Sequence, residues 1–298
     1  VMEAWDTLRD KGPRRVLPTA VPALMPNAPA AAVGIELGAH GGIHAPVSAC
    51  ASGAEAIAYG ADLIALGRAD VVVAGGTDAA LHPMTVAAFG AMRALSTRNA
   101  DPQTASRPFA PDRDGFVLGE GAGILVLERA GHAIARGARV LAVLAGSGVT
   151  ADAYDVARPE PSGAEQERAL QLALERADLG ADAVGHVNAH ATSTPAGDVV
   201  EAGVLARTVP SAAVSATKSA TGHLLGGAGG LEAVLTVMAL QARWAPPTLL
   251  PAGVDPELAQ LELDVVGPQG RDLLQLTAAA STSFGFGGHN VALVFTRQ

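Results

Sequence analysis

Cysteine and lysine are both scarce in this sequence of 298 residues. Cys50 is its one cysteine, which excludes an internal disulfide framework and fits a reducing compartment, so we expect a cytoplasmic protein. Of the 20 basic residues only Lys11 and Lys218 are lysines, and the others are arginines. A lysine in such an arginine-rich chain directs attention to its surroundings.

Aromatic residues make up 3% of the chain, and the formal net charge is −9. No basic stripe with interleaved aromatic residues occurs, so we expect no nucleic-acid partner. The longest uncharged stretch, Val16 to Ile35, contains four prolines, so we expect no membrane insertion, and no signal peptide is visible. With 49% hydrophobic residues, the chain is able to bury a sizeable core.

Several catalytic signatures are missing as well. The sequence has no HExxH or CxxC pair for a metal, no strand-GxGxxG-helix or GxxxxGK[ST] for a nucleotide, and no GxSxG for a serine hydrolase. Glycine-rich segments occur at 119–123, 226–230 and 285–288. We interpret the first two as sites of close backbone packing, whereas the third is able to aim backbone N–H groups at a ligand.

Short apolar strands alternate with amphipathic helices along the chain, which favours an α/β fold with largely parallel sheets. We expect a strand to end at 46–49 and to lead into Cys50–Gly53. A helix with Ile57, Ala61 and Ile64 on one face follows and is ended by Gly67, and a strand is expected at 70–74. The pattern then predicts strands at 125–127, 141–144, 186–189 and 213–215, helices at 130–136, 165–176, from 198 and at 231–240, and a terminal hairpin of 278–283 and 291–295. We place a boundary between two similar halves near residue 140, which gives residues 1–140 and 141–298.

Four residues are candidates for chemistry. Cys50 lies where a strand turns into a helix, and the helix N-terminus would favour its thiolate; the alternative is a small buried hydrophobe. His190 follows an apolar strand, and His223 comes five residues after Lys218. The alternatives are a histidine held by local hydroxyls and a solvated lysine. Taken together, a soft nucleophile and potential oxyanion donors fit acyl transfer through thioesters.

These residues lie in motifs that resemble the β-ketoacyl-acyl-carrier-protein synthases, the elongating condensing enzymes of fatty acid and polyketide synthesis. The motifs appear in the family's order over nearly the whole chain: Val47–Gly53, Ser106–Phe109, Arg113–Gly121, Asn188–Asp198, Lys218–His223 and Ser283–Gly288. The resemblance is to free-standing type II enzymes of the actinobacterial kind. It implies a thiolase-like fold, two similar α/β halves in five α-β-α-β-α layers. The family's additional N-terminal segment is not in this chain, so the first half would be incomplete.

The resemblance implies a decarboxylative Claisen condensation. Cys50 would hold the acyl chain, while His190 and His223 would stabilise the enolate formed from malonyl-acyl-carrier-protein. Lys218 would act through its charge near the histidines, and Glu232 would support that loop.

Further roles follow from the same resemblance. The backbone N–H of Phe286, with that of Cys50, would hold the oxyanion, and Phe286 would gate the acyl pocket. Thr192 and Thr194 would bind the pantetheine arm, and Ala157 replaces a threonine that contacts this arm in many relatives.

The resemblance also implies partners. Arg14, Arg15 and Arg93 would contact an acidic acyl carrier protein, and the enzyme would be a homodimer without a metal or other cofactor. Two alternatives remain: a non-catalytic partner subunit resembling a chain-length factor, and a thiolase-like enzyme using CoA thioesters. The subunits of the first kind lack the nucleophile, which this chain retains.

Overall fold

The computed structural model describes residues 2–250 and 252–298, and the chain divides into two compact units, Val1–Val47 and Ser48–Gln298. The first unit contains helices α1 (Met2–Lys11), α2 (Ala20–Leu24) and α3 (Ala28–Glu36) and the 3₁₀ turn η1 (Pro13–Arg15). Prolines begin η1 and lie in the first turn of α3, where a missing N–H costs no helical hydrogen bond.

The second unit contains all of the strands in the described residues. In chain order its elements are η2 (Ala49–Ala51), α4 (Ser52–Ala65), β1 (Val71–Asp78), α5 (Pro83–Ala91), η3 (Pro102–Thr104), β2 (Gly121–Glu128), α6 (Ala130–Ala135), β3 (Val143–Ala151), α7 (Ala164–Ala177), η4 (Ala181–Ala183), β4 (Val184–Asn188), α8 (Pro195–Thr208), β5 (Ala213–Ser215), α9 (Lys218–Thr221), η5 (Leu225–Gly227), α10 (Ala228–Ala242), β6 (Trp244–Ala245), α11 (Pro256–Ala259), β7 (Arg271–Asp272), β8 (Ala278–Gly285) and β9 (His289–Thr296).

The main sheet has the strand order β3-β9-β8-β4-β5. Strand β4 pairs in parallel with β5 and β8, whereas β3, β9 and β8 are antiparallel neighbours. Strands β1 and β2 form a separate antiparallel pair, and so do β6 and β7. The prediction of largely parallel sheets is therefore wrong, because β9 runs against both β3 and β8 and the two smaller sheets are antiparallel pairs.

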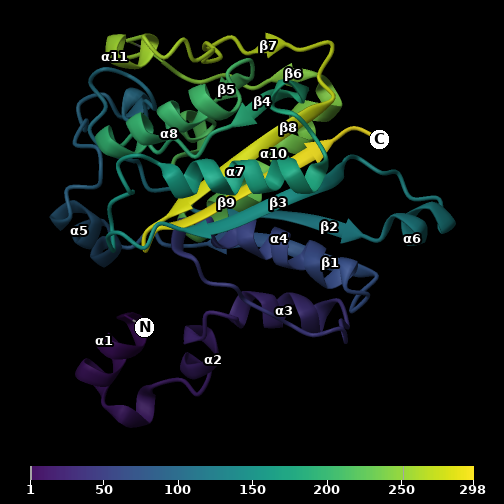
Figure 1. Cartoon of the computed structure of the whole chain (residues 1–298). Helices are drawn as coiled ribbons and strands as arrows, with labels where there is room; N and C mark the ends of the chain where they lie inside the picture. Colours follow the sequence, from purple (N-terminus) through teal and green to yellow (C-terminus); the bar gives the residue numbers. More distant parts are fainter. Residues whose placement is uncertain (1, 251) are drawn as a thin grey trace. The chain divides into compact units, whose positions relative to one another are not determined.

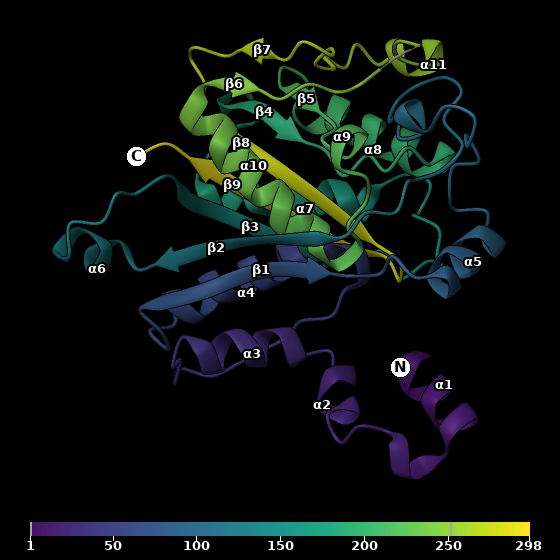
Figure 2. The ribbon, with the colours of Figure 1, turned by 180° about the vertical axis from the view of Figure 1, so that it is seen from behind.

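Helices cover both faces of the main sheet. Helices α7 and α8 pack on one face, while α4 and α10 lie between the other face and the β1–β2 pair (Figures 1 and 2). Alternation along the strands separates the two cores: Ala280 and Val294 face α7 and α8, and Ala279 and Leu293 face α4 and α10. The second unit thus has β-α-β-α order, four of the five expected layers.

The central layer is packed closely through glycine. A Cβ on Gly123 of β2 would lie 2.1 Å from the backbone N of Leu231, and one on Gly230 would lie 2.3 Å from the backbone O of Gly123. Both contacts are far inside van der Waals distance, so only glycine allows β2 and α10 to approach. This confirms the interpretation of segments 119–123 and 226–230 as packing glycines.

Among the described residues one apolar segment, Leu225–Ala242, has the length and composition of a membrane span, and 56% of it is buried inside the protein. It comprises η5 and α10, and α10 packs against β2, β8 and α4. These contacts are those of a core helix in a layered α/β protein.

Most of the predicted elements are confirmed to within a few residues, including the helix ended by Gly67 and the terminal hairpin. The strand expected at 46–49 is wrong: residues 42–48 have no regular structure, and Ala49 begins η2. These residues have no ladder partner among the described residues, and a strand exists only as part of a ladder. The predicted division near residue 140 stays a prediction.

Candidate active site

A cavity of about 350 Å³ in the second unit brings together most of the predicted site residues. Its lining includes Cys50, His190, His223, Thr192 and Phe286. The residues come from η2, directly before α4, and from the segments that follow β4, β5 and β8. Because these three strands run parallel, their carboxyl ends meet at one edge of the sheet, where α/β proteins form their sites.

Cys50 lies in a tight turn at the entrance of α4. The preceding residue, Ala49, has φ 50°, and the Ser52 hydroxyl holds the turn by accepting from the Ser48 N–H at 2.9 Å. The glycine loop packs directly on this turn, since a Cβ on Gly285 would lie 2.5 Å from the Ser48 carbonyl oxygen. The fold therefore fixes the nucleophile against the loop that contains Phe286.

Burial raises the pKa of the Cys50 thiol to about 11, although the Lys218 charge and the backbone N–H groups of Phe286 and Cys50 act in the opposite direction. The expectation of a thiolate favoured by the helix N-terminus is therefore wrong. The thiol is only 9% exposed, and loss of hydration outweighs the favourable dipoles around it. The two N–H groups that act on the sulfur are the ones expected to hold an oxyanion.

His190 is buried, and its ring is oriented by a lysine. The Lys218 Nζ donates to Nδ1 of His190 over 3.2 Å, so Nδ1 is an acceptor and the ring proton lies on Nε2. Burial, followed by the charge of Lys218 and the neighbouring His223, lowers the pKa of His190 well below its usual value. His190 is thus a neutral imidazole that presents an N–H donor.

His223 is the second imidazole of the cavity. Its ring centroid lies 5.3 Å from that of His190, in an edge-to-face arrangement. Burial, with a contribution from Lys218, lowers the pKa of His223 well below its usual value. Both ring nitrogens are buried without a hydrogen-bond partner in the described protein, so they are available to a ligand.

Lys218 is 1% exposed and forms an ion pair with Glu232 of α10. Burial raises the pKa of Glu232 to about 7, against the charge of Lys218 and its hydrogen bond. A buried ammonium needs a partner of opposite charge, and Glu232 supplies it. The ion pair holds Lys218 beside His190.

Thr192 and Thr194 follow His190 along the cavity wall. Their hydroxyl oxygens are 3.1 Å apart, and both residues line the cavity. Ala157 lies in the same wall and has no polar side-chain atom. The aromatic lining includes Phe284, whose ring centroid lies 5.8 Å from that of His190, beside Phe286.

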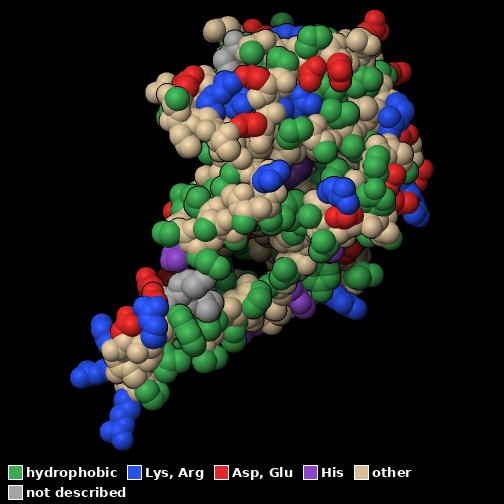
Figure 3. All heavy atoms as spheres, turned by 90° about the vertical axis from the view of Figure 1, so that its left-hand side faces the viewer, with side chains coloured by type: hydrophobic (Ala, Val, Ile, Leu, Met, Phe, Trp, Pro, Cys, Tyr) green, Lys and Arg blue, Asp and Glu red, His purple; other side chains and the backbone are tan. Residues whose placement is uncertain are grey.

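The three arginines expected at a carrier-protein surface fall in different units. Arg93 is exposed and lines the cavity, whereas Arg14 and Arg15 are exposed in η1 of the first unit. On the face drawn in Figure 3, several basic side chains lie together on the first unit, whereas those of the second unit are dispersed among acidic and hydrophobic ones. Of the three arginines, only Arg93 lies in the second unit, where it lines the same cavity as Cys50 and the two histidines.

Two acidic residues of α8 were not identified from the sequence. Glu201 is 1% exposed, and its carboxylate accepts from the backbone N–H of His190 at 2.8 Å and of Ala191 at 2.6 Å. Asp198 accepts from the N–H of Ser193 at 3.1 Å and of Phe109 at 2.9 Å, and burial raises its pKa to about 7. The signal in the sequence is their i, i+3 spacing after the polar turn, which puts both on one helix face.

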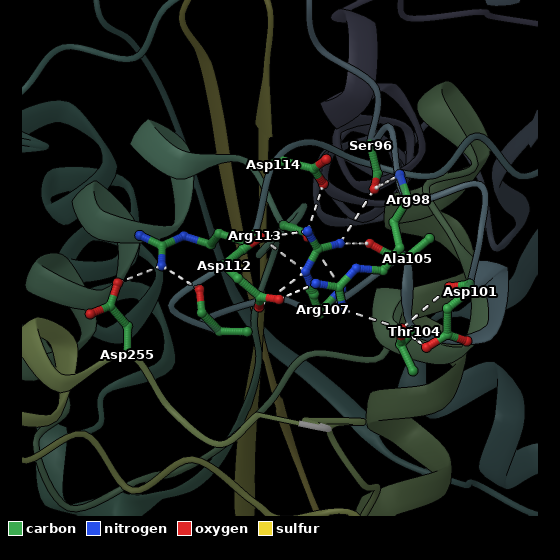
Figure 4. Close-up of polar contacts among 12 residues, drawn as sticks. Ser96, Arg98, Asp101, Thr104, Ala105, Arg107, Asp112, Arg113, Asp114 and Asp255 are labelled. Atoms are coloured by element: carbon green, nitrogen blue, oxygen red, sulfur yellow. Dashed lines mark hydrogen bonds and ion pairs between the residues drawn. The ribbon is translucent and has the colours of Figure 1, made fainter.

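A buried arginine network holds the segment that precedes Phe116 of the cavity wall. Figure 4 shows Arg107 reaching Asp112 and Asp114, with 2.9 Å between its Nη2 and Oδ1 of Asp114. Arg113 donates to Asp255 at 2.8 Å, and its Nε lies 3.7 Å from Asp198. Motifs 106–109 and 113–121 therefore have a structural role here: they tie this segment to α8.

Two family models match the chain: the N-terminal domain of β-ketoacyl synthases over residues 2–133 and the C-terminal domain over residues 141–250. The chain is 46% identical to 3-oxoacyl-[acyl-carrier-protein] synthase 2 of Synechocystis sp., with 100% of this chain and 72% of the relative aligned. The protein of the same name from Staphylococcus aureus is also 46% identical, with 99% of this chain and 71% of the relative covered.

Solved structures show the same fold. A β-ketoacyl synthase from Burkholderia phymatum matches with a TM-score of 0.92 and 40% identity, over 100% of this chain and 72% of that one. A ketosynthase complex, described as a type II polyketide synthase acyl-carrier protein with its ketosynthase bound to the hexaketide, matches with a TM-score of 0.93 and 30% identity, over 100% and 74%. The expected thiolase-like fold is thereby confirmed, and the chain spans 72% of the length of the Burkholderia protein and 74% of the ketosynthase in the complex.

Proposed function

This chain belongs to the β-ketoacyl synthase family, and on that premise we propose that its cavity performs the decarboxylative Claisen condensation of an acyl thioester with malonyl-acyl-carrier-protein. One observation carries the proposal: a thiol, Cys50, shares a buried cavity with two neutral imidazoles, His190 and His223. The reaction needs a nucleophile and hydrogen-bond donors, and these groups supply both.

The first step is acyl transfer to Cys50. The sulfur attacks the thioester carbonyl, the carrier thiol leaves with the proton, and one thioester bond replaces another. The thiolate is the attacking species, and with a pKa of about 11 little of Cys50 is ionised at neutral pH, so the sulfur has to lose its proton as it attacks. The developing oxyanion would accept from the backbone N–H groups of Cys50 and Phe286.

The second step is loss of CO₂ from the malonyl group. The bond to the carboxylate breaks, and its electron pair forms an enolate whose oxygen accepts from the Nε2–H of His190 and from His223. Lys218 keeps the proton of His190 on Nε2. The enolate carbon then attacks the acyl carbonyl on Cys50, the C–S bond breaks, and the sulfur recovers a proton. No metal or small cofactor takes part.

The substrates would arrive on the arm of an acyl carrier protein. Thr192 and Thr194 offer hydroxyl groups to that arm, and Phe286 would gate the acyl end of the cavity. Arg93, at the cavity wall, would meet the acidic carrier, and we include Arg14 and Arg15 in the same proposal. A homodimer and a cytoplasmic location complete it.

Intact mass spectrometry tests the proposal, because the single thiol makes the result unambiguous. Incubation with an acyl-carrier thioester is expected to add one acyl mass, and Cys50→Ala is expected to remove the addition. Release of ¹⁴CO₂ from malonyl-acyl-carrier-protein is expected to fall about 10²-fold or more in His223→Ala and to be unchanged in His40→Ala, an exposed histidine of the first unit.

Each alternative has its own outcome. A folded wild-type chain that is never acylated would favour the non-catalytic partner subunit. Acylation from CoA thioesters without CO₂ release would favour the thiolase-like enzyme. Unchanged decarboxylation in His223→Ala would remove that residue from the mechanism.

A further inference from the structure

Gln166 lies in the first turn of α7 and has no part in the chemistry described above. Its side chain is 3% exposed and lines the cavity together with Ala157, Thr192 and Thr194. The amide oxygen Oε1 is buried and has no hydrogen-bond partner in the described protein. Buried polar atoms are nearly always paired, so this orphan acceptor beside a cavity points to a ligand.

A helix-capping role does not explain Gln166. Glutamine at this position of a helix often accepts from the backbone N–H of the N-cap residue, which here is Gly163. That N–H already donates to the carbonyl of Glu160 at 3.0 Å. The cost of the unpaired oxygen is therefore not offset within the helix.

The two acidic side chains of the cavity wall already accept hydrogen bonds from the protein. Asp152 accepts from Asn290 at 2.6 Å and from the Glu160 N–H at 3.1 Å. Glu201 accepts from His190, Ala191 and Thr282. Arg158, also in the wall, offers donors only. Gln166 Oε1 is thus an acceptor in this wall without a hydrogen-bond partner in the described protein.

We propose that Oε1 of Gln166 accepts a hydrogen bond from an amide N–H of the pantetheine arm, so that Gln166 determines recognition of the carrier-borne thioester. This inference rests on the proposed function and adds a residue to it. The arm contains two secondary amides, and each has one N–H. The threonine hydroxyls act as donors or acceptors, whereas Oε1 only accepts, so it selects for a donor on the arm.

A substrate-side change isolates this contact. Acyl-pantetheine is compared with two analogues, each having one amide replaced by an ester, which removes one N–H and keeps the length of the arm. The rate of Cys50 acylation is measured by intact mass for the wild type, for Gln166→Met and for Gln171→Met. Gln171 is an exposed glutamine of the same helix and serves as the control.

We expect one ester analogue to reduce kcat/KM about three- to tenfold in the wild type and in Gln171→Met, mainly through KM. Gln166→Met is expected to lose the same factor with acyl-pantetheine and to show no further loss with that analogue. This coupling would not arise from a merely structural role.

Equal losses in Gln166→Met and the wild type, or no loss with either analogue, would overturn the role of Gln166. If Gln166→Met does not fold, the test depends on the wild type alone. Equal rates of Cys50 acylation from acyl-pantetheine and from both ester analogues would refute the contact. A wild type that no thioester acylates would overturn the proposed function and this inference together. Acylation without discrimination would overturn only the inference.

Discussion

The Lys218 ammonium donates to Nδ1 of His190 over 3.2 Å and pairs with the Glu232 carboxylate on its other side. The imidazole is consequently held as the tautomer with its proton on Nε2. A positive charge thus lies behind the ring, and a neutral donor faces the cavity.

Replacing Lys218 by Met is expected to lower malonyl decarboxylation about 10²-fold, because Nδ1 of His190 loses its donor and the tautomer is no longer held. Since the replacement also leaves Glu232 as an unpaired buried carboxyl, Lys218→Met/Glu232→Gln provides a second variant in which no charge remains. The assay is CO₂ release, and Lys11→Met, at the other and exposed lysine, is the control. Normal CO₂ release in the double variant would show that the lysine is not needed.

Cys50 is expected to react slowly with iodoacetamide at neutral pH. Because the pKa of its thiol is about 11, the rate should increase about tenfold per pH unit between pH 6 and pH 9, without a plateau. Mass spectrometry of the single thiol gives the rate, and Cys50→Ser gives the blank. A plateau below pH 8 would mean that the helix N-terminus and Lys218 outweigh burial.

Substitution of Gly285 by Ala is expected to destabilise the nucleophile turn by about 2 kcal/mol and to abolish acylation of Cys50. The new Cβ would meet the Ser48 carbonyl oxygen at 2.5 Å and the Cys50 N at 3.2 Å. Gly267→Ala is the matched control, since nothing lies within 4 Å of its Cβ position. Urea unfolding and intact mass are the measurements, and normal acylation in Gly285→Ala would contradict the packing.

The buried imidazole of His186 is expected to lower the free energy of unfolding in acid. Burial lowers its pKa to about 3, and its Nε2 lies 3.0 Å from the Ser215 hydroxyl while Nδ1 has no partner. The unfolded state, with a pKa near 6.5, binds the proton first, so this contribution is complete above pH 6.5 and is lost as the pH falls toward 3. The expected loss is about 3 kcal/mol between pH 6.5 and pH 4.

The check is urea unfolding of the wild type and of His186→Phe across this pH range. The variant lacks the titrating ring, so its stability should fall less steeply with acid. Asp198 and Glu232, whose pKa values are raised to about 7, change stability in the opposite direction in both proteins and cancel in the comparison. If the free energies of unfolding of the two proteins fell in parallel with pH, protonation of His186 would not destabilise the folded state.

Features that depend on residues close together in the sequence agree best with the structure. Short motifs predict Cys50, His190, Lys218 and His223. Three of them line one cavity, and Lys218 contacts His190. The helices and most strands followed from local periodicity, which depends on neighbours a few residues apart. The strand expected at 46–49 failed because a strand needs a partner distant in the chain, and local pattern does not supply one.

The sequence by itself determined which chemistry is possible: one thiol, two histidines in motifs and one lysine, each beside a turn that glycine or serine permits. The tertiary structure decided what those groups are. Burial makes Cys50 a thiol of high pKa, holds both histidines neutral, and leaves Gln166 with an unpaired oxygen. Hydration and hydrogen-bond partners depend on residues from distant segments packed around each group, so only the folded chain fixes them.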